Sequence, residues 1–501
     1  MHERFMEQQA TIILDPTLAV PLHKQLYEGV RSAILRGQLQ AGERVPSTRA
    51  FARELGISRA TVQLTFQQLI AEGYLQGRAG SGTYVVAATF PAEGVEQPVQ
   101  DAHPGQSSSA GRTISARAHT WLSTPSVSEP LLVPGQGLQR AFRVGLSALD
   151  AFPRKLWQQL LLRSWRQMPP ELPAYHQPAG YLPLREAIAS YLATARGVRC
   201  TAEQVILVTG MQQGLDLAAR VLLDPGEQVW MEDPGYPGAR GALLGAGARL
   251  VPVPIDAQGL VVQRGKARAP HARLAFVTPS HQFPLGVTMS MARRLSLLAW
   301  ANEASAWIVE DDNDGEFRYV GRPLAALQGI DRANRVIYLG SVSKVLFPAM
   351  RLGYLVVPPD LVNVFLAAHL LTGIHPPLLE QITLAAFLHE GHFVRHIRQL
   401  RQLYQERQVT LVELAREMLA GKLDVQPAVA GMHLIGWLPG KQDDRQVARA
   451  AARVWVDVSP LSLYALEGSE RTGILLGYTA VGTEEMRAGL QRLASVLVTP
   501  R

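Results

Sequence analysis

The segment Ser341–Tyr354, SVSKVLFPAMRLGY, places a lysine among hydroxyl side chains and an arginine seven residues further on. A lysine at a strand end, desolvated by its neighbours, is expected to have a lowered pKa and to form an imine with an aldehyde. Ser341, Ser343 and Arg351 are expected to bind a phosphate, because an arginine gives it charge-assisted hydrogen bonds. The alternative for Lys344 alone is a solvated surface lysine, so this chemistry depends on the rest of the chain.

A phosphate site needs more donors, and the segment VTGMQQGLDLA offers them. It places Gly210, Met211 and Gln212 between an expected strand and an expected helix. Backbone N–H groups at the start of a helix bind anions, and the helix dipole favours this binding. The alternative is a glycine that only the turn requires.

Two more segments carry side chains that suit an aromatic ligand. In MEDPGYPG, the ring of Tyr236 is placed to lie flat on another ring, although a core tyrosine is the alternative. The run IVEDDNDGEFRY ends an apolar strand in carboxylates, and one of them can hold a protonated ring nitrogen. We expect the remaining acids of this run to be solvated or bound to local backbone N–H groups.

These side chains must be held by a sheet. Apolar strand-like runs alternate with helix-length segments, a pattern typical of a mostly parallel sheet with helices on both faces. The expected strands are Val205–Gly210, Glu227–Glu232, Leu274–Pro279, Trp307–Asp312 and Val336–Ser341. The larger domain is therefore predicted to be α/β.

The composition limits the class of protein. A chain of 501 residues with 47% hydrophobic and 18% charged residues predicts a soluble globular protein of two or more domains. The one cysteine, Cys200, excludes an intrachain disulfide and a cysteine-rich zinc site, so we expect no metal and a cytoplasmic location. No signal peptide and no apolar run of membrane length is evident, and the net charge of +7 allows a polyanionic partner.

A change in composition separates the domains. The segment from Ala88 to Pro130 is rich in Gly, Ser, Pro and Gln and lacks apolar periodicity, which indicates a linker. The predicted organisation is a small domain over 1–87, a linker over 88–129 and a large domain over 130–501.

The small domain shows three helical patterns. In the first, Leu22, Leu26, Val30 and Ile34 lie four residues apart, and Gly37 follows as a stop. In the second and third, Ser47 and Ser58 are expected to be N-caps. The third is expected to bury Val62, Phe66, Leu69 and Ile70 and to expose Arg59, Thr61, Gln63 and Thr65.

Two short helices joined by a glycine turn match the geometry that places a recognition helix in the major groove of DNA. The segment YLQGRAGSGTYVV adds two strand-like pieces around a glycine-rich turn, which predicts a wing. Periodicity alone is also compatible with any small three-helix unit.

Residues 21–85 resemble the GntR-type winged helix-turn-helix over nearly its full length. Carried over to matching positions, this resemblance implies DNA contacts by Arg49, Arg59, Thr61, Gly80 and Gly82. Phosphate contacts are expected from Ser47, Ser58 and Arg78, with helix capping as the alternative for both serines.

The large domain resembles a class I/II aminotransferase of fold type I, whose cofactor is pyridoxal 5'-phosphate (PLP). The segments that match in order are AYHQPAGYLPLREAIASYLATARGV, VTGMQQGLDLA, EDPGYPG, TPSHQFPLG, EDDNDGEFRY and SVSKVLFPAMRLGY. The resemblance implies that Lys344 holds PLP as an internal aldimine, Asp311 pairs with the pyridine nitrogen and Tyr236 stacks on the ring. It places around the phosphate Met211, Gln212, Ser341, Ser343 and Arg351.

At three positions the sequence departs from the aminotransferase pattern, and in that pattern these positions bind the substrate or tune the cofactor. Phe283 stands where the pattern has an asparagine that bonds the phenolic oxygen, and His281 is expected to take this role. Asn313 stands where many relatives have a tyrosine, and its amide substitutes only in part. Leu475 stands where an arginine grips the substrate carboxylate, and Arg471 lies nearby in sequence.

The whole chain resembles the MocR/GabR family of bacterial transcription regulators. We therefore expect a PLP-dependent, DNA-binding regulator that senses PLP itself, in vitamin B6 metabolism, or an amino compound through an aldimine at Lys344. The alternative is an active aminotransferase with Lys344 as its catalytic residue; we expect residual or absent activity. The resemblance implies a cytoplasmic, nucleoid-associated, head-to-tail homodimer that binds double-stranded DNA with repeated half-sites and no membrane.

Overall fold

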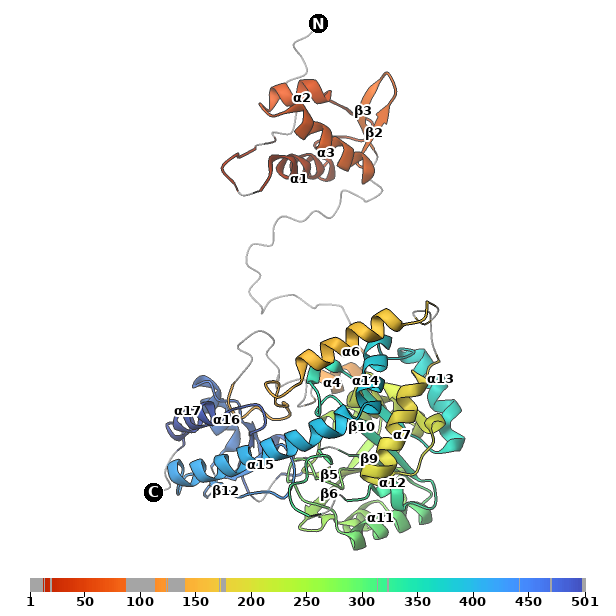
Figure 1. Ribbon diagram of the computed structural model, residues 1–501, viewed down its shortest axis with the longest axis vertical. Coiled ribbons are helices and arrows are strands. Elements are labelled where there is room, and N and C mark those ends of the chain that lie inside the picture. The colour runs from red at the N-terminus through yellow and green to blue at the C-terminus, as the bar shows by residue number, and fades with distance from the viewer. Residues whose placement is uncertain are drawn as a thin grey trace. The chain divides into compact units, whose positions relative to one another are not determined.

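The computed structural model describes Ile12, Thr124, Leu172 and residues 14–18, 20–86, 113–122, 140–170, 177–312, 314–321, 324–440, 442–468 and 471–497. The chain divides into two compact units, a head over Met1–Arg112 and a body over Thr113–Arg501 (Figure 1).

The head is a winged helix-turn-helix, as predicted. Its helices are α1 (Leu22–Leu35), α2 (Thr48–Glu54) and α3 (Arg59–Ala71). Its antiparallel sheet has the order β1 (Arg44–Val45), β3 (Gly82–Val85), β2 (Leu75–Arg78). The hairpin β2–β3 is the wing. The core is apolar and is formed mainly by Leu26, Val30, Val62, Phe66 and Leu69.

Two expectations for α3 are wrong, and helical spacing explains both. Thr65 is buried, 1% exposed, because it lies three residues after Val62 on the same face of the helix. Its hydroxyl is satisfied by donating to the carbonyl oxygens of His23 and Thr61, each at 3.1 Å. Ile70 is 42% exposed, because it follows Leu69 by one residue and so points about 100° away from the buried face.

The body contains the α/β sheet that the apolar runs predict. Its eight strands have the order β4-β11-β10-β9-β8-β5-β6-β7. Strands β10, β9, β8, β5 and β6 are parallel neighbours, whereas β11 is antiparallel to both β4 and β10. The strands are β4 (Val205–Val208), β5 (Gln228–Asp233), β6 (Arg249–Asp256), β7 (Gly259–Leu260), β8 (Leu274–Val277), β9 (Trp307–Asp311), β10 (Val336–Ser341) and β11 (Gly353–Val356).

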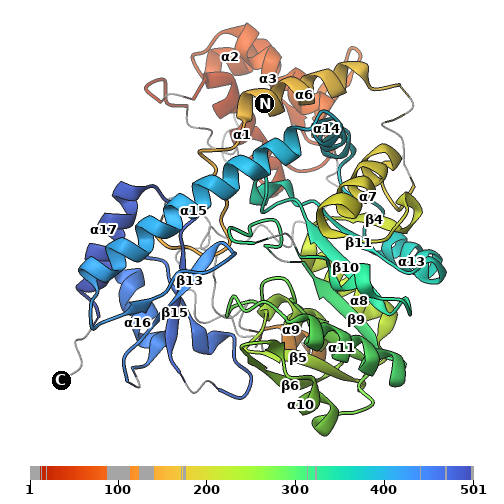
Figure 2. The same cartoon turned by 60° about the horizontal axis from the view of Figure 1, so that its bottom comes forward.

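Helices cover this sheet, and a second lobe lies beside it (Figure 2). The helices of the first lobe are α6 (Arg154–Gln167), α7 (Leu182–Arg196), α8 (Met211–Leu222), α9 (Pro237–Gly245), α10 (Val262–Arg268), α11 (Met291–Glu303), α12 (Leu327–Ile330), α13 (Val362–Thr372) and α14 (Leu378–His389). The long helix α15 (His392–Met418) runs along both lobes.

The second lobe is built on a four-stranded antiparallel sheet of order β12-β13-β15-β14. Its strands are β12 (Asp424–Val425), β13 (His433–Trp437), β14 (Ser459–Pro460) and β15 (Gly473–Gly477), and its helices are α16 (Asp444–Arg453) and α17 (Thr483–Ala494). This lobe brings residues late in the chain next to the lysine loop.

The predicted linker over 88–129 is too long at its C-terminal end. Helix α4 (Ala116–Leu122) lies inside it and belongs to the body. It packs on α9, where a Cβ atom at Gly245 would lie 2.5 Å from Nε1 of Trp121. The composition hid this helix, because ARAHTWL carries only two large apolar side chains. Apart from residues 113–115 and Thr124, the rest of the predicted linker lies outside the described residues.

Among the described residues, no helix combines the length and the apolar character that crossing a membrane requires. Within the same ranges, no group of three or more His, Cys, Asp or Glu side chains is placed to hold a metal ion.

Candidate cofactor site and DNA-binding surface

Lys344 lies in the loop that follows β10, at the carboxyl edge of the sheet, as predicted. Its side chain is 33% exposed, and its Nζ lies 3.1 Å from Oδ1 of Asp314. Asp314 is 3% exposed, so the lysine reaches from a partly open site to a buried carboxylate.

The pKa of Lys344 contradicts the expectation of a lowered value. Burial lowers the pKa, but the negative charges of Asp314 and Asp311 outweigh burial, so the net direction is upward. Without a ligand, this lysine is an ammonium ion held by carboxylates. Desolvation alone would lower the pKa of Lys344, and the pairing with Asp314 reverses this direction.

Asp311 ends β9 next to this lysine and is 4% exposed. Its Oδ1 atom has no hydrogen-bond partner among the described residues. Burial raises the pKa of Asp311 to about 7, and the charge of Lys344 acts in the opposite direction. A buried carboxylate oxygen without a donor is costly, so this atom is placed to receive a cationic N–H group from a ligand.

His281 is 1% exposed, and neither ring nitrogen makes a hydrogen bond of good geometry in the described structure, although the backbone of Ala430 lies close enough to act on the pKa of the ring. Its Nδ1 lies 3.8 Å from Oδ2 of Asp314. Burial lowers the pKa of His281 to about 4, so the imidazole is neutral at neutral pH. Two glycines make room for the ring: a Cβ at Gly431 would overlap it, and one at Gly286 would lie 3.2 Å from Nε2.

Tyr236 caps the N-terminus of α9 and lies in the electrostatic environment of Asp311, Lys344 and Arg351. Burial raises the pKa of this tyrosine, so its hydroxyl is protonated. Its ring meets the ring of Phe283 edge-on at a centroid distance of 5.8 Å.

The start of α8 forms the expected cup. Gly210 caps this helix with φ 94°, a conformation that glycine adopts without strain. A Cβ at Gly210 would lie 3.3 Å from Cζ of Arg351, so the guanidinium lies directly against the helix start. The backbone N–H groups of Met211 and Gln212 occupy the first two helical positions, which have no intrahelical acceptor.

Three of the side chains expected at the phosphate, those of Gln212, Ser341 and Ser343, make hydrogen bonds within the protein. The Gln212 amide donates to the carbonyl oxygen of Gly238 at 2.9 Å. The Ser341 hydroxyl accepts from the N–H group of Ser343 at 3.3 Å, and the Ser343 hydroxyl accepts from that of Leu352 at 3.3 Å. The Ser343 hydroxyl also donates to the carbonyl oxygen of Leu352 at 3.4 Å, so both hydroxyls shape the loop.

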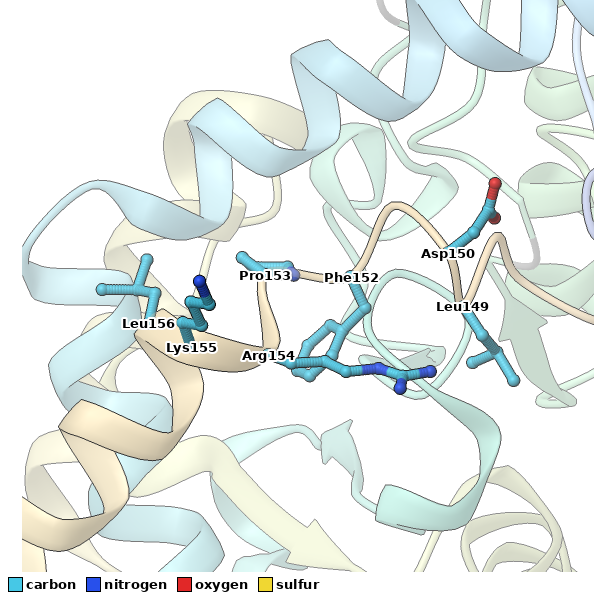
Figure 3. Close-up of a pocket in the computed structure, with 7 residues that line it drawn as sticks. All are labelled: Leu149, Asp150, Phe152, Pro153, Arg154, Lys155 and Leu156. Carbon is cyan, nitrogen blue, oxygen red and sulfur yellow. The ribbon is translucent and has the colours of Figure 1, made fainter.

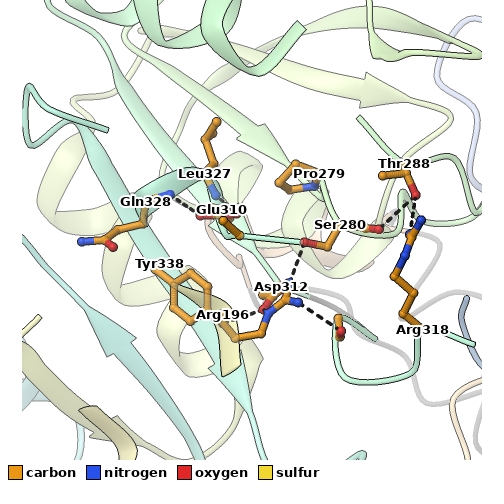
Figure 4. Close-up of polar contacts among 12 residues, drawn as sticks. Arg196, Pro279, Ser280, Thr288, Glu310, Asp312, Arg318, Leu327, Gln328 and Tyr338 are labelled. Carbon is orange, nitrogen blue, oxygen red and sulfur yellow. Dashed lines mark hydrogen bonds and ion pairs between the residues drawn. The ribbon is translucent and has the colours of Figure 1, made fainter. Parts of the chain in front are cut away.

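The other acids of the run EDDNDGE are not solvated, which corrects that expectation. Arg196, at the end of α7, donates to both carboxylate oxygens of Asp312 at 2.6 and 2.5 Å and to Oγ of Ser280 at 2.8 Å (Figure 4). Burial raises the pKa of Asp312, but Arg196 outweighs it and the net direction is downward. The Tyr338 hydroxyl also donates to Asp312 at 2.6 Å.

Glu310 points to the side of β9 opposite Asp311 and accepts from the N–H groups of Leu327 and Gln328 at the start of α12, at 2.6 and 2.9 Å (Figure 4). Glu310 is therefore bound to backbone N–H groups, one of the two environments expected for the remaining acids of this run. Burial raises its pKa to about 7. Asn313 lies outside the described residues.

Phe283 and Leu475, two of the departures from the aminotransferase pattern, lie in one apolar cluster. Leu475 is fully buried with Leu461, Leu463 and Tyr464, and Phe283 packs against the same group. The guanidinium of Arg471 stacks on the Trp437 ring at 4.1 Å.

The head displays its predicted DNA-binding residues at the surface. Arg49, Arg59 and Arg78 are exposed, and Thr61 is partly exposed. Ser47 and Ser58 are both N-caps, with oxygens that accept from the N–H groups of Ala50 at 3.2 Å and Thr61 at 3.1 Å.

In the wing, Gly80 and Gly82 have φ 73° and 117°. A Cβ at Gly82 would lie 2.6 Å from Nε of Arg44, so this glycine is also needed within the protein. Arg44 is a further exposed cation at the wing that the sequence analysis missed.

A separate hollow lies at the start of α6 and is lined by Leu149, Asp150 and residues 152–156 (Figure 3). Asp150 is paired with Arg407 at 2.6 Å, and the Phe152 ring packs on Phe347 at 5.0 Å. No residue of the lysine site lines this hollow, and we assign no chemistry to it.

The site residues that the sequence missed are Asp314, Gly431 and Arg196. The letters EDDNDGE contain Asp314 but do not show which acid meets the lysine. Gly431 lies 150 residues after His281 in the sequence and carries no local signal.

Family comparisons agree with this architecture. Residues 148–493 match the model of aminotransferase class I and II, and residues 22–85 match that of bacterial regulatory proteins of the gntR family. In structure, the chain is similar to kynurenine aminotransferase from Pyrococcus horikoshii (TM-score 0.67, 25% identity, 78% of this chain and 96% of that one). It is also similar to LysN, an α-aminoadipate aminotransferase from Thermus thermophilus (TM-score 0.69, 26% identity, 77% and 97%).

The fold and the site thus define a regulator in which a DNA-binding head is fused to an aminotransferase-type body. The chain is 42% identical to the probable rhizopine catabolism regulatory protein MocR of Rhizobium meliloti, over 97% of this chain and 96% of that protein. It is 30% identical to the pyridoxine biosynthesis transcriptional regulator PdxR of Corynebacterium glutamicum, over 97% and 98%. The chain belongs to the MocR-type transcription regulators.

The cofactor of this family's body is PLP, and the residues of this chain fit it. The buried Asp311 oxygen without a donor suits the ring N–H group, and the two ring nitrogens of His281 suit polar atoms of the ligand. Arg351 and the start of α8 form a cationic cup for the phosphate.

Proposed function

We propose that the body senses PLP, or a small amino compound that reacts at Lys344, and that this ligand changes how the head binds DNA. The observation that carries the proposal is the set of buried polar atoms without hydrogen bonds of good geometry beside Lys344, on Asp311 and His281. A ligand that gives these atoms hydrogen-bond partners would stabilise one state of the body over another.

The side chains of the site have separate tasks in this proposal. PLP supplies an aldehyde with which a primary amine reacts. Lys344 provides the amine of the protein, Arg351 and the first N–H groups of α8 neutralise the phosphate, and Asp311 holds the ring nitrogen. Tyr236 packs on the ring, and His281 accepts or donates a hydrogen bond at its polar edge.

Regulation is favoured over transamination by the apolar cluster around Leu475. A carboxylate there would lose its water without gaining a guanidinium, because Phe283, Leu461 and Leu463 surround this position. An active aminotransferase remains the second candidate, supported by the intact lysine and aspartate. Sustained conversion of bound PLP to its amine form, at enzymatic rates with one of a panel of amino acids, would establish the second candidate instead.

PLP itself is the first effector to test. The relative PdxR is named for the regulation of pyridoxine biosynthesis, and the relative MocR for rhizopine catabolism. The two names differ in the pathway that is regulated, so the effector is decided by experiment.

The head is proposed to contact DNA through its exposed arginines and its wing. We infer that Arg49, Arg59 and Thr61 reach base edges or phosphates, with Gly80, Gly82 and Arg78 at the backbone of DNA. Ser47 and Ser58 serve first as caps. Two heads in a head-to-tail homodimer would read repeated half-sites, and such a regulator acts in the cytoplasm, at the bacterial nucleoid.

The test is DNA binding by the full chain to its own upstream region, measured at fixed salt with increasing PLP. We expect the affinity or the footprint to change, with a midpoint at the PLP concentration that half-saturates the body. An unchanged affinity and footprint at saturating PLP would refute sensing of PLP, and the same assay with amino compounds then tests the other effector class.

A further inference from the structure

Asp314 is the carboxylate that pairs directly with the lysine in the described structure, and neither the lysine motif nor the departures from the aminotransferase pattern assign it a role. Its Oδ1 lies 3.1 Å from Nζ of Lys344, and its Oδ2 lies 3.8 Å from Nδ1 of His281. Both oxygens therefore face the cofactor site.

The position of Asp314 is fixed by the backbone. The residue has φ 57°, in the left-handed region, where aspartate and asparagine are the commonest residues after glycine. Its carbonyl oxygen accepts from the N–H group of Phe317 at 2.9 Å, which closes the turn. The turn thus aims a buried carboxylate at the lysine rather than at solvent.

We propose that Asp314 is the counter-ion of Lys344, which holds the ammonium form until a ligand arrives and sets the pH at which the lysine becomes reactive. An amine reacts with an aldehyde only as the neutral base, so whatever stabilises the ammonium ion delays the reaction. The proposal concerns the protein before it captures its cofactor and does not depend on the sensing of PLP.

Other charged and titratable groups also face the lysine, and Asp314 differs from them. They are Asp311 on β9, Tyr236 at α9, His281 after β8, Arg351 in the lysine loop and His433 on β13. The two histidines are kept neutral by burial, which lowers the pKa of each, and the pKa of Tyr236 is raised. Asp311 contributes a second negative charge, but Asp314 makes the direct ion pair at 3.1 Å.

The variant Asp314→Asn tests this role without disturbing the turn, because asparagine adopts the left-handed conformation as readily as aspartate. Full-length, cofactor-free protein is labelled with trace acetic anhydride at a series of pH values, and mass spectrometry measures acetylation of Lys344. The exposed residue Lys155 is an internal reference.

In the native protein, we expect the midpoint for Lys344 to lie above the ordinary lysine value. In Asp314→Asn, we expect it to fall by one pH unit or more, so that labelling below both midpoints becomes about tenfold faster. Asp150→Asn, which removes a carboxylate paired with Arg407, should leave the Lys344 midpoint in place.

Folding of the variant is checked in the same samples. Lys422 donates to the carbonyl oxygen of Ala494 at 3.1 Å, so its labelling rises if the second lobe opens. With Lys422 protected, an unchanged or higher Lys344 midpoint in Asp314→Asn would overturn the proposal, as would an equal downward shift in Asp150→Asn. Neither result would affect the proposed regulation, since no PLP or DNA is present.

Discussion

The head and the body keep their functional side chains in opposite environments. Arg49, Arg59 and Arg78 of the head are exposed, whereas Asp311, Asp314 and His281 of the body are each at most 4% exposed. Exposed cations meet a polyanion without prior desolvation, and phosphate contacts give affinity through charge. Buried acids and a neutral imidazole are held in position before the ligand arrives, at the expense of stability.

This difference predicts how each unit responds to substitution. The head should lose DNA affinity without unfolding, because few of its contacts depend on the exposed arginines. The body should lose either ligand binding or stability, because its charges form a connected network behind the site.

The largest effect is expected for Lys344→Ala. Loss of the amine removes the covalent attachment point, so we expect the visible absorbance of bound PLP to disappear. DNA binding measured without PLP should remain close to that of the native chain, since the head is intact. An imine absorbance band retained in this variant, fixed to the protein by borohydride reduction, would show that PLP is attached at another residue.

The next effect concerns stability of the body. Arg196→Met leaves Asp312 buried without its partner and should lower the free energy of unfolding by about 3–5 kcal/mol. All 8 tryptophans lie in the body, so tryptophan fluorescence during urea unfolding reports on this unit alone.

The matched control for this substitution is Arg163→Met, which breaks an exposed ion pair with Glu390 and should change the free energy by less than about 1 kcal/mol. Equal losses in the two variants would contradict the contrast between buried and exposed charges.

A smaller effect is expected for the head variant Arg59→Ala. Loss of one exposed contact should weaken DNA binding by about 1–3 kcal/mol and leave PLP absorbance unchanged. Binding is measured over a range of salt, and a flatter salt dependence identifies a phosphate contact. Arg36→Ala, at the end of α1, serves as the control with equal loss of charge. If both variants lose the same affinity, Arg59 makes no specific contact.

The smallest effect separates capping from DNA contact at Ser58. Ser58→Ala removes the cap of α3 and should reduce the stability of the head by about 1 kcal/mol, read as faster hydrogen exchange in this helix. Ser58→Asn restores a capping oxygen. If Ser58→Asn recovers exchange protection but not DNA affinity, the hydroxyl also contacts phosphate.

Patterns that are local in sequence were sufficient to predict much of the fold and part of the candidate site. The spacing of Ser341, Lys344 and Arg351 and the alternation of strands and helices predicted the loop at the sheet edge. The caps at Ser47 and Ser58 followed from the side-chain types alone. These features depend on neighbours within a few residues.

Features that depend on distant parts of the chain were not predicted. The pair Arg196–Asp312 joins residues 116 apart, and Gly431 reaches His281 from the second lobe. The raised pKa of Lys344 required knowing that the backbone at Asp314 is left-handed. The burial of Thr65 was open to prediction from helical spacing, but its polar type suggested exposure.

The central claim, that a ligand of the body and DNA at the head influence one another, is tested most directly from the side of the cofactor. The dissociation constant of PLP is measured by absorbance, with and without a saturating DNA fragment from the protein's own upstream region. Linkage requires that DNA change the dissociation constant of PLP and that PLP change the dissociation constant of DNA by the same factor, typically about 5- to 150-fold. Our account predicts that DNA changes the dissociation constant of PLP in the native protein. In Arg59→Ala, the same constant should stay unchanged at DNA concentrations that are too low for this variant to bind. An identical dissociation constant of PLP with and without bound DNA would contradict the coupling between body and head.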